Sequence, residues 1–340
     1  MRVAVIGAGS WGTAVSALLG GKGLDVQLWA REPEIAEGIN TLRRNPLYLK
    51  ELAIPASVVA THDIERAIAA TEAVIVVTPS HGVRGVAEAM APTLGSDVPV
   101  VNLSKGVEQG TQLRMTQVLE EVIGHRERLA VLSGPNHAEE VSRGVPSAAV
   151  VAAHDEGVAR TLQDVFMAPM FRVYTNSDVI GVELGGASKN VVAVAAGMSD
   201  GLGYGDNTKA TLMTRGLAEM SRLGAHLGAN PLTYMGLAGV GDLIVTCTSR
   251  HSRNRAFGEW VARGGSVDGY AAETKMVAEG YRTALSLDEL GRQIGIELPI
   301  THQVRSILYD GHAPEDAAVL LMGRSATDEL HGLGLVEDEG

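Results

Sequence analysis

The sequence predicts two domains: an α/β domain with a doubly wound, mostly parallel sheet over residues 1–180, and an all-α domain over residues 181–340. In the first half of the chain, short and nearly continuous apolar runs alternate with helical patterns, as in parallel sheets covered on both faces. After about residue 180 such runs nearly vanish, and long stretches rich in Ala, Leu, Met and Gly with helical spacing replace them. A length of 340 residues also fits two domains of roughly 100–200 residues each.

Seven short apolar runs are the expected strands of the sheet. The run Ala73-Val74-Ile75-Val76-Val77 is the clearest, because it is apolar throughout and of strand length. Runs of this kind are buried on both faces, so helices are expected on each side of the sheet. In chain order the expected strands are residues 3–6, 25–29, 73–77, 98–103, 129–132, 148–152 and 171–174.

The second domain is expected to be helical, with residues 212–227 and 283–294 as clear examples. Apolar stretches such as residues 191–198 are far shorter than the ~20 residues of a membrane span. The first apolar run, residues 3–6, leads directly into glycines and is too short for a signal peptide. We therefore expect a cytoplasmic protein without membrane insertion.

Composition excludes several functional classes. With 28 Lys and Arg against 40 Asp and Glu, the net charge of −12 argues against a nucleic-acid-binding protein, which needs a basic face. The hydrophobic share of 45% excludes global disorder. The single cysteine, Cys247, excludes an intramolecular disulfide and a cysteine zinc site, and is expected to be a small buried apolar residue. The 10 histidines show no metal-binding spacing, so no metal is expected.

A glycine-rich motif follows the first strand directly. Gly7, Gly9 and Gly12 form G-x-G-x-x-G at a strand-to-helix junction, the nucleotide-binding fingerprint of a Rossmann-type domain. Gly7 would permit the tight turn, Gly9 the approach of a pyrophosphate, and Gly12 close packing of the helix on the strand. The helix N-terminus would offer N–H groups and a positive dipole end to the phosphates. The alternative is a glycine-rich turn that binds nothing.

The end of the second strand normally determines which cofactor is bound. An NAD site places an acidic residue there for the ribose 2′-hydroxyl, but this chain has Ala30 and then Arg31. The planar fork of Arg31 can pair with a 2′-phosphate, which favours NADPH, with NADH also accepted. Glu32 could instead support NAD, and a plain surface pair between Arg31 and Glu32 is the alternative.

Polar residues follow three later strands at the same carboxyl edge of the sheet. The turn at residues 78–81 follows the strand at residues 73–77 and is expected to line the nicotinamide ribose. Its His81 is interpreted as an ordinary loop histidine, with a catalytic base as the alternative. Lys105 lies just past the next strand, where it either binds substrate and cofactor or is a solvated loop lysine. After residues 129–132, Gly134 begins a stiff turn with exposed backbone donors, and Asn136 and Ala138 open the next helix.

Lys189 is the strongest catalytic candidate. The residues that follow it, 191–196, are apolar on every side and predict a buried helix that begins at this lysine. A buried lysine is costly unless it reaches a cavity or a partner, and burial lowers the pKa of a lysine toward values suited to proton transfer. The alternative is a structural ion pair with Glu183.

A phosphate-binding cluster is suggested further along the chain. Ser252, Arg253 and Asn254 offer a hydroxyl, a guanidinium and an amide in succession, which suits a phosphate if they open a helix. The alternative is a helix-capping serine followed by exposed arginines. Asp242 lies upstream, before a short apolar run that fits either a strand or a helix.

With these residues laid out, the chain resembles the bacterial-type, NAD(P)-dependent glycerol-3-phosphate dehydrogenases from Val3 to about Glu329. Several motifs in the same order make this resemblance far more specific than the glycine loop alone. They are GAGSWGTA (7–14), LSKG (103–106), SGPNHAEE (133–140), the long stretch from FRVYTN to DGLG (171–203), TRGLAEMSRLG (214–224), GLAGVGDLIVTCTS (236–249), SRNRAFG (252–258) and VAEGYRT (277–283).

The resemblance implies reversible reduction of dihydroxyacetone phosphate to sn-glycerol 3-phosphate, in a cytoplasmic homodimer that supplies the backbone of glycerophospholipids. It implies that Lys189 transfers the proton and that Lys105 touches both cofactor and substrate. Asp242 would position either the Lys189 ammonium or a substrate hydroxyl. It assigns substrate binding to Gly134, Asn136, Asp242, Ser252, Arg253 and Asn254, and nucleotide binding to Ser10, Trp11, Arg31, Ala138, Arg253, Val277 and Glu279. Asn136 departs from the Ser or Thr usual in the family, although an amide can still donate to an oxygen.

Two other interpretations remain at this point. A β-hydroxyacid or ketopantoate-type dehydrogenase would share the glycine loop and the lysine, but it acts on a carboxylate and does not need the cluster at residues 252–254. A cofactor-sensing or scaffolding protein with an inactive site would not need Lys105 and Lys189, both of which are present.

Overall fold

The computed structural model describes residues 1–274, 278–326 and 328–329. The chain divides into two compact units. We call the first, residues 1–105 and 114–179, the sheet unit. We call the second, residues 106–113 together with the described residues from Ile180 onward, the helical unit. The segment 106–113 thus groups with the helical unit although it lies within the first half of the sequence.

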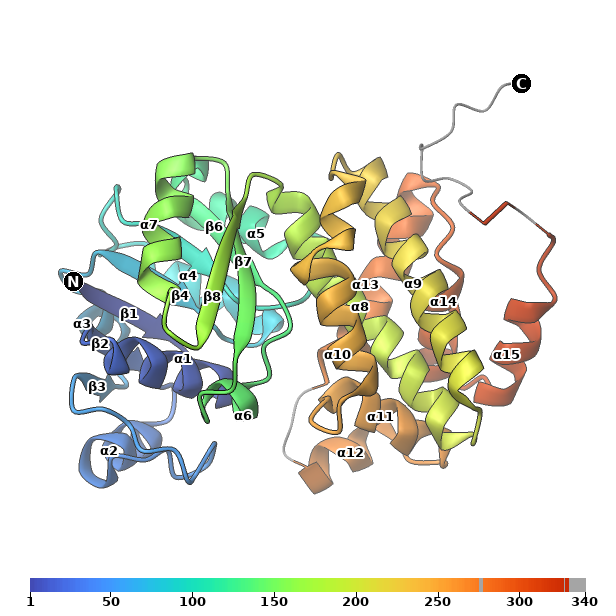
Figure 1. Ribbon diagram of the computed structural model, residues 1–340, viewed down its shortest axis with the longest axis horizontal. Helices are drawn as coiled ribbons and strands as arrows, with labels where there is room; N and C mark the ends of the chain where they lie inside the picture. The colour runs from blue at the N-terminus through green and yellow to red at the C-terminus, as the bar shows by residue number, and fades with distance from the viewer. Residues whose placement is uncertain (275–277, 327, 330–340) are drawn as a thin grey trace. The chain divides into compact units, whose positions relative to one another are not determined.

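The sheet unit contains one eight-stranded sheet in the order β3-β2-β1-β4-β5-β6-β7-β8 (Figure 1). All neighbouring strands are parallel except β6 and β7, which pair antiparallel with Ala130 opposite Ala153. This confirms the predicted doubly wound, mostly parallel sheet. The strands are β1 (Arg2–Ile6), β2 (Asp25–Trp29), β3 (Val58–Thr61), β4 (Ala73–Val76), β5 (Val100–Asn102), β6 (Leu129–Ser133), β7 (Ser147–Ala153) and β8 (Phe171–Asn176).

Seven of the eight strands coincide with the predicted runs, and β3 was missed. It is short, lies at the edge of the sheet, and its Val59 is exposed, so it lacks the continuous apolar character of the others. Its pairing with β2 places Val58 opposite Val26. The strand is therefore defined by its neighbour more than by its own sequence.

Helices cover both faces of the sheet. On one side α1 contacts α6 and α7, and on the other α4 contacts α3 and α5. The core between these layers is built from small aliphatic side chains such as Val3, Val5 and Ile75. The helices are α1 (Ser10–Gly21), α2 (Pro33–Leu42), α3 (Ile64–Ile68), α4 (Val83–Met90), α5 (Met115–Ile123), α6 (Ala138–Val141) and α7 (Glu156–Phe166).

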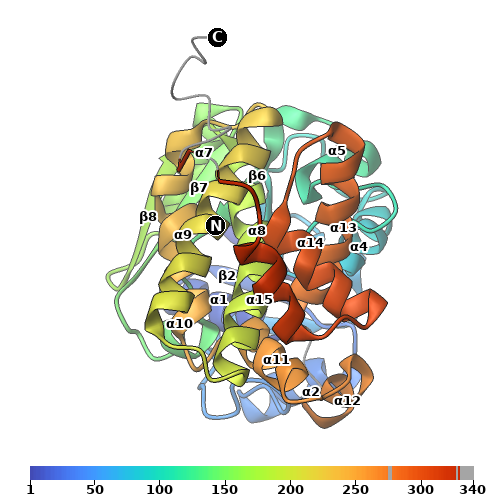
Figure 2. The same ribbon diagram turned by 90° about the vertical axis from the view of Figure 1, so that its right-hand side faces the viewer.

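The described part of the helical unit consists of helices joined by short turns, as predicted. The long helices α8 and α9 lie beside α14 and α15 (Figure 2). The helices are α8 (Val179–Gly201), α9 (Asp206–His226), α10 (Asp242–Thr248), α11 (Arg253–Ala262), α12 (Val267–Thr274), α13 (Glu279–Ile294), α14 (Pro299–Arg305) and α15 (Pro314–Met322).

Helix α8 corrects two expectations. It begins at Val179, so Lys189 lies near its middle and does not begin it. The glycines of α8 lie within a continuous helix and allow other segments to pack closely against it. A Cβ at Gly197, for example, would lie 1.9 Å from the carbonyl oxygen of Arg255. At 23 residues α8 is also long and apolar enough to cross a membrane, contrary to the expectation that no stretch approaches that length. However, 94% of its most apolar window is buried, as in the core helix of a globular unit.

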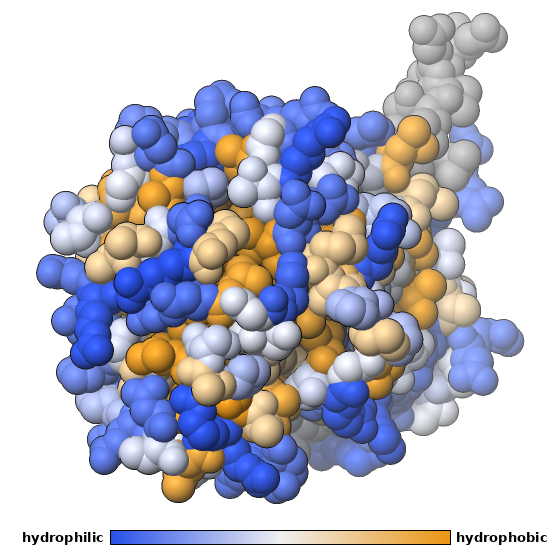
Figure 3. Space-filling model, turned by 60° about the vertical axis from the view of Figure 1, so that its left-hand side comes forward, coloured by the Kyte–Doolittle hydropathy of each residue, from blue (hydrophilic) through white to orange (hydrophobic). Residues whose placement is uncertain are grey.

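The surface carries both polar and apolar side chains. On the face drawn in Figure 3, polar residues dominate the outline and apolar side chains form small groups between them. Large exposed apolar residues include Leu232 and Met235, in the short helical turn that follows α9, and Val319 and Met322 on α15.

Candidate active site

The glycine loop between β1 and α1 has the geometry of a nucleotide-binding turn. Gly7 has φ of +125°, a conformation that side chains rarely adopt, and a Cβ there would lie 2.9 Å from the carbonyl oxygen of Val77. A Cβ at Gly12 would lie 1.8 Å from the carbonyl oxygen of Gly7. These two glycines are therefore required by the fold itself.

Gly9 differs from both, because none of the described residues requires it to be glycine. Its φ of −72° and ψ of −174° suit any residue, and a Cβ there would meet no atom within 4 Å. The space lies at the N-terminus of α1, whose first turn carries no acidic residue and no side-chain cap. An open space beside the positive end of a helix fits the pyrophosphate of a dinucleotide. Ser10 and Trp11 begin this helix, and the ring of Trp11 packs beside Phe171 at 6.4 Å between centroids.

Asn45 holds the glycine loop from outside the motif, and sequence reasoning missed it. Its Nδ2 donates to the carbonyl oxygen of Ala8 at 2.9 Å and to Oγ1 of Thr13 at 2.9 Å. Its Oδ1 accepts from the backbone N–H groups of Leu47 and Tyr48, both at 2.9 Å. The buried amide thereby uses its donors and acceptors to tie the loop after α2 to the residue between Gly7 and Gly9.

Arg31 and Glu32 follow β2, as the sequence indicated. The Arg31 guanidinium donates to Oε1 of Glu32 at 2.6 Å, and its side chain is 80% exposed. An exposed pair of this kind contributes little to stability, so Arg31 can exchange this partner for a ligand phosphate at low cost.

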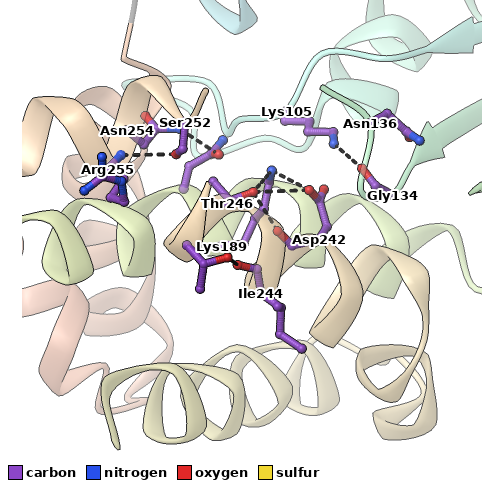
Figure 4. A network of polar contacts seen from close by, with 12 residues as sticks. Lys105, Gly134, Asn136, Lys189, Asp242, Ile244, Thr246, Ser252, Asn254 and Arg255 are labelled. Atoms are coloured by element: carbon purple, nitrogen blue, oxygen red, sulfur yellow. Dashed lines mark hydrogen bonds and ion pairs between the residues drawn. The ribbon is translucent and has the colours of Figure 1, made fainter. Parts of the chain in front are cut away.

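Lys105, Gly134 and Asn136 are brought together within the sheet unit (Figure 4). Lys105 Nζ donates to the carbonyl oxygen of Gly134 at 3.0 Å. Asn136 Nδ2 donates to the carbonyl oxygen of Ala148 at 2.9 Å, and its buried Oδ1 has no hydrogen-bond partner among the described residues. The turn before Lys105 is fixed by Asn102, whose side chain bonds to both the N–H and the carbonyl oxygen of Ser104.

A buried polar cluster surrounds Lys189 within the helical unit, as Figure 4 shows. Lys189 Nζ donates to Oδ1 of Asp242 and to Oγ1 of Thr246, both at 2.6 Å. Thr246 Oγ1 in turn donates to the carbonyl oxygen of Asp242 at 2.6 Å. The side chains of Lys189 and Asp242 are only 7% and 2% exposed. The carboxylate thus balances the ammonium charge where water cannot, and the cluster holds a proton donor in a fixed position.

The next residue on α8 belongs to a second set of contacts. Asn190 Oδ1 accepts from Nδ2 of Asn254 at 2.9 Å, and Oδ1 of Asn254 accepts from the N–H of Gly280 at 2.9 Å. Ser252 caps α11, because its Oγ accepts from the N–H of Arg255 at 3.2 Å. Arg253 opens this helix and is exposed. The cluster at residues 252–254 therefore opens a helix, as both interpretations of it predicted, and the capping serine with an exposed Arg253 also matches the alternative interpretation.

The remaining predicted residues have simpler surroundings. Ala138 opens the short helix α6 and Glu279 opens α13, whereas Val277 lies outside the described residues. Cys247 is fully buried, as expected, and burial raises the pKa of its thiol to about 12. Within the described ranges, no group of three or more His, Cys, Asp and Glu side chains is placed to hold a metal ion.

Thr246 is the second residue that sequence reasoning missed. Asp242 and Thr246 are four residues apart, and a helix places such residues on one face. The spacing would have revealed the pair had the run after Asp242 been assigned as a helix.

Comparisons with known proteins agree with this geometry. The family models for the N-terminus and the C-terminus of NAD-dependent glycerol-3-phosphate dehydrogenase match residues 2–159 and 178–319. Glycerol-3-phosphate dehydrogenase (NAD(P)+) 1 of Salinibacter ruber is 51% identical over 329 residues, 96% of each chain. The corresponding Pelotomaculum thermopropionicum protein is 49% identical over 98% of this chain and 96% of its own. The crystal structure of glycerol-3-phosphate dehydrogenase from Coxiella burnetii superimposes with a TM-score of 0.91 at 34% identity, covering 95% of this chain and 99% of that one.

Proposed function

The chain belongs to the NAD-dependent glycerol-3-phosphate dehydrogenase family, and we propose that it catalyses the reversible NAD(P)H-dependent reduction of dihydroxyacetone phosphate to sn-glycerol 3-phosphate. The observation that carries this proposal is the buried cluster of Lys189, Asp242 and Thr246. It places a cationic proton donor in a fixed position, as reduction of a ketone requires.

Lys189 is the proposed catalytic residue. During reduction the ketone carbon accepts a hydride, which the nicotinamide cofactor supplies when it is bound. Negative charge then develops on the carbonyl oxygen, where the Lys189 ammonium stabilises it and donates the proton. Asp242 and Thr246 hold Nζ at 2.6 Å each, so the donor does not have to be oriented during the reaction.

The other predicted site residues are proposed to bind the ligands. Lys105, Gly134, Asn136, Asp242, Ser252, Arg253 and Asn254 bind the substrate, and the Arg253 guanidinium grips its phosphate. The orphaned Oδ1 of Asn136 supports this assignment, because a buried acceptor without a partner suits a substrate hydroxyl donor. Binding energy from the phosphate, which does not react, then orients the ketone.

The cofactor-binding residues fit a dinucleotide. The open space at Gly9 and the N-terminus of α1 suit the pyrophosphate, and Arg31 suits a 2′-phosphate. We propose that NADPH is preferred and NADH accepted. The proposed nucleotide-binding residues are Gly7, Gly9, Ser10, Trp11, Gly12, Arg31, Lys105, Ala138, Arg253, Val277 and Glu279.

An NADPH-oxidation assay tests the proposed function. Dihydroxyacetone phosphate, ketopantoate and other ketoacids are compared at equal concentration, and kcat/KM is measured for each. Dihydroxyacetone phosphate is expected to be the best substrate, because a guanidinium recognises its phosphate. A higher kcat/KM for ketopantoate would refute the proposal.

We also propose that the enzyme acts in the cytoplasm as a homodimer and supplies the backbone of glycerophospholipids. The proposed product is a phosphorylated glycerol. Acyl transfer to the hydroxyl groups of such a molecule gives the backbone of a glycerophospholipid. Size-exclusion chromatography with light scattering measures the oligomeric state directly.

Replacing Arg31 by aspartate is expected to lower the NADPH to NADH ratio of kcat/KM by about 10- to 100-fold. The physical reason is the loss of a charge-assisted hydrogen bond to the 2′-phosphate, worth about 1.5–3 kcal/mol. Arg160→Asp is a matched control, because Arg160 is also exposed and paired with a neighbouring glutamate in the sheet unit. An unchanged ratio in Arg31→Asp would make Arg31 a surface residue only.

Replacing Asn45 by alanine is expected to raise the KM for NADPH at least about fivefold with little change in kcat. The loop loses a buried hydrogen-bonding group, a cost of about 1–3 kcal/mol, and the glycine turn loses its support. Asn40→Ala is the control, because the Asn40 amide makes a similar pair of bonds to the backbone of Ala60. If both variants are destabilised but neither changes the KM for NADPH, Asn45 serves the fold alone.

A further inference from the structure

A large groove lies within the helical unit and contains no residue of the proposed active site. Its volume is about 800 Å³, within the range of small-ligand pockets. Residues of α8, α9, α14 and α15 line it, and Figure 2 shows α15 in front of α8 with α9 and α14 on either side. Met198, Leu202, Leu212, Ile300 and Leu321 give the walls their apolar character.

Three guanidinium groups also line the groove, on Arg215, Arg222 and Arg324. Arg215 donates to the carbonyl oxygen of Glu329 at 2.7 Å, and Arg222 to that of Glu297 at 3.0 Å. Burial lowers the pKa of the Arg222 guanidinium, the Glu219 and Glu297 carboxylates raise it, and the positive charges of Arg215 and Arg324 lower it. All three guanidinium groups belong to the lining of one groove.

Two acidic residues line the same groove, Glu297 and Glu219. Glu297 binds Arg324 at 2.5 Å. Glu219 is buried, and its carboxylate accepts the N–H groups of Ile300 and Thr301 at the start of α14. Burial raises the pKa of Glu219, whereas its hydrogen bonds to Thr301 and Ile300 lower it. Three arginines therefore line the groove against two glutamates.

We propose that this groove binds a single-chain anionic amphiphile: one alkyl or acyl chain against the apolar walls, with a carboxylate or phosphate headgroup at the arginines. The apolar walls of the groove explain the chain, because each methylene that leaves water tightens binding by about fourfold. The arginines explain the headgroup, since their planar forks bind carboxylates and phosphates with two parallel hydrogen bonds. The site is separate from Lys189, so a ligand here would act without occupying the place of the substrate.

Isothermal titration calorimetry of the full-length protein tests the proposal, with every amphiphile kept below its critical micelle concentration. Dodecyl phosphate or dodecanoate is expected to bind with 1:1 stoichiometry, and the stronger of the two identifies the headgroup. Octyl phosphate is expected to bind at least about tenfold more weakly than dodecyl phosphate, because four methylenes are missing. Dodecyltrimethylammonium, which has the same chain and the opposite charge, is expected to bind at least about tenfold more weakly as well.

Two variants test the binding of the alkyl chain and of the headgroup separately, and a third variant is the control. Leu212→Trp fills the groove and is expected to weaken both anionic amphiphiles at least tenfold, while Leu232→Trp, at an exposed leucine, leaves them unchanged. Arg222→Gln is expected to weaken the anionic amphiphiles by about tenfold and to leave dodecanol unaffected. All three variants should retain wild-type kcat with dihydroxyacetone phosphate.

Three results would overturn the proposal. Equal binding of the cationic and anionic amphiphiles would show non-specific adsorption. Displacement of dodecyl phosphate by dihydroxyacetone phosphate or NADPH would place it in the active site. A change of oligomeric state in Leu212→Trp without a change in amphiphile affinity would make the groove an interface between copies of the chain.

Discussion

Lys189→Ala is expected to lower kcat for dihydroxyacetone phosphate by at least about two orders of magnitude. Proton transfer by a positioned side chain contributes typically ~10²–10⁴-fold, and in this variant no ammonium remains beside Asp242 and Thr246. NADPH binding, measured by fluorescence, is expected to stay near normal, because the glycine loop belongs to the sheet unit. Steady-state kinetics and the fluorescence titration together check this separation.

Structural damage is the competing explanation for such a loss, and the geometry allows a control. Removing Lys189 leaves the Asp242 carboxylate buried without the positive charge that balances it, which typically costs about 3–5 kcal/mol of stability. The double variant Lys189→Met with Asp242→Asn removes both charges, so it should recover most of the melting temperature. It should not recover activity, since the proton donor is still missing.

Lys189→Arg should also stay inactive, because a guanidinium remains protonated and is the wrong shape for this cluster. If the double variant turns over at near wild-type rate, Lys189 is not the proton donor. If it is stable and inactive, the loss of activity is chemical and does not result from unfolding.

The sheet was largely predictable because buried parallel strands carry their signal in their own residues. The runs that became β1 and β4 are apolar over nearly their full length, and the boundaries of β1, β2 and β4 agree with the sequence to within one residue. The edge strand β3 carries no such signal and depends on its pairing with β2. Local pattern therefore predicts the centre of this sheet and fails at its edge.

The candidate site was predictable in its residue types but not in its contacts. Lys189 stands out because a charge within an apolar helix needs a partner. Which carboxylate supplies that partner depends on how α8 packs against α10, and residue 242 is far from residue 189 in sequence. The sequence left two candidate partners for Lys189 open: Glu183 on the same helix, and Asp242 as a group that positions either the ammonium or a substrate hydroxyl. The structure places Asp242 Oδ1 2.6 Å from Nζ.

Asn45 could not be found from the sequence for a similar reason. Its four hydrogen bonds join two loops separated by more than thirty residues, at Ala8 and Thr13 on one side and at Leu47 and Tyr48 on the other. Asparagine is common in loops, so the residue type alone gives no sign of this role. Only the fold shows that it supports the glycine turn.

The second large effect is expected at Gly9, where valine should weaken NADPH binding by at least about 100-fold and leave the melting temperature unchanged. The backbone at Gly9 is extended, and a Cβ meets no atom of the described residues within 4 Å, so the fold tolerates the side chain. The isopropyl group would instead occupy the space proposed for the pyrophosphate and hold it away from the N–H groups of α1. Losing one or two charge-assisted hydrogen bonds at about 1.5–3 kcal/mol each accounts for the size of the effect.

Two other glycines of the same helix make this prediction specific. Gly21→Val, at the far end of α1, also meets no atom within 4 Å and should change neither stability nor NADPH affinity. Gly12→Ala should destabilise the protein, because its Cβ would lie 1.8 Å from the carbonyl oxygen of Gly7. NADPH affinity by fluorescence and the melting temperature are measured for all three variants. A stable Gly9→Val variant with wild-type affinity would mean that the pyrophosphate does not bind at the N-terminus of α1, and the cofactor assignment of the glycine loop would be wrong.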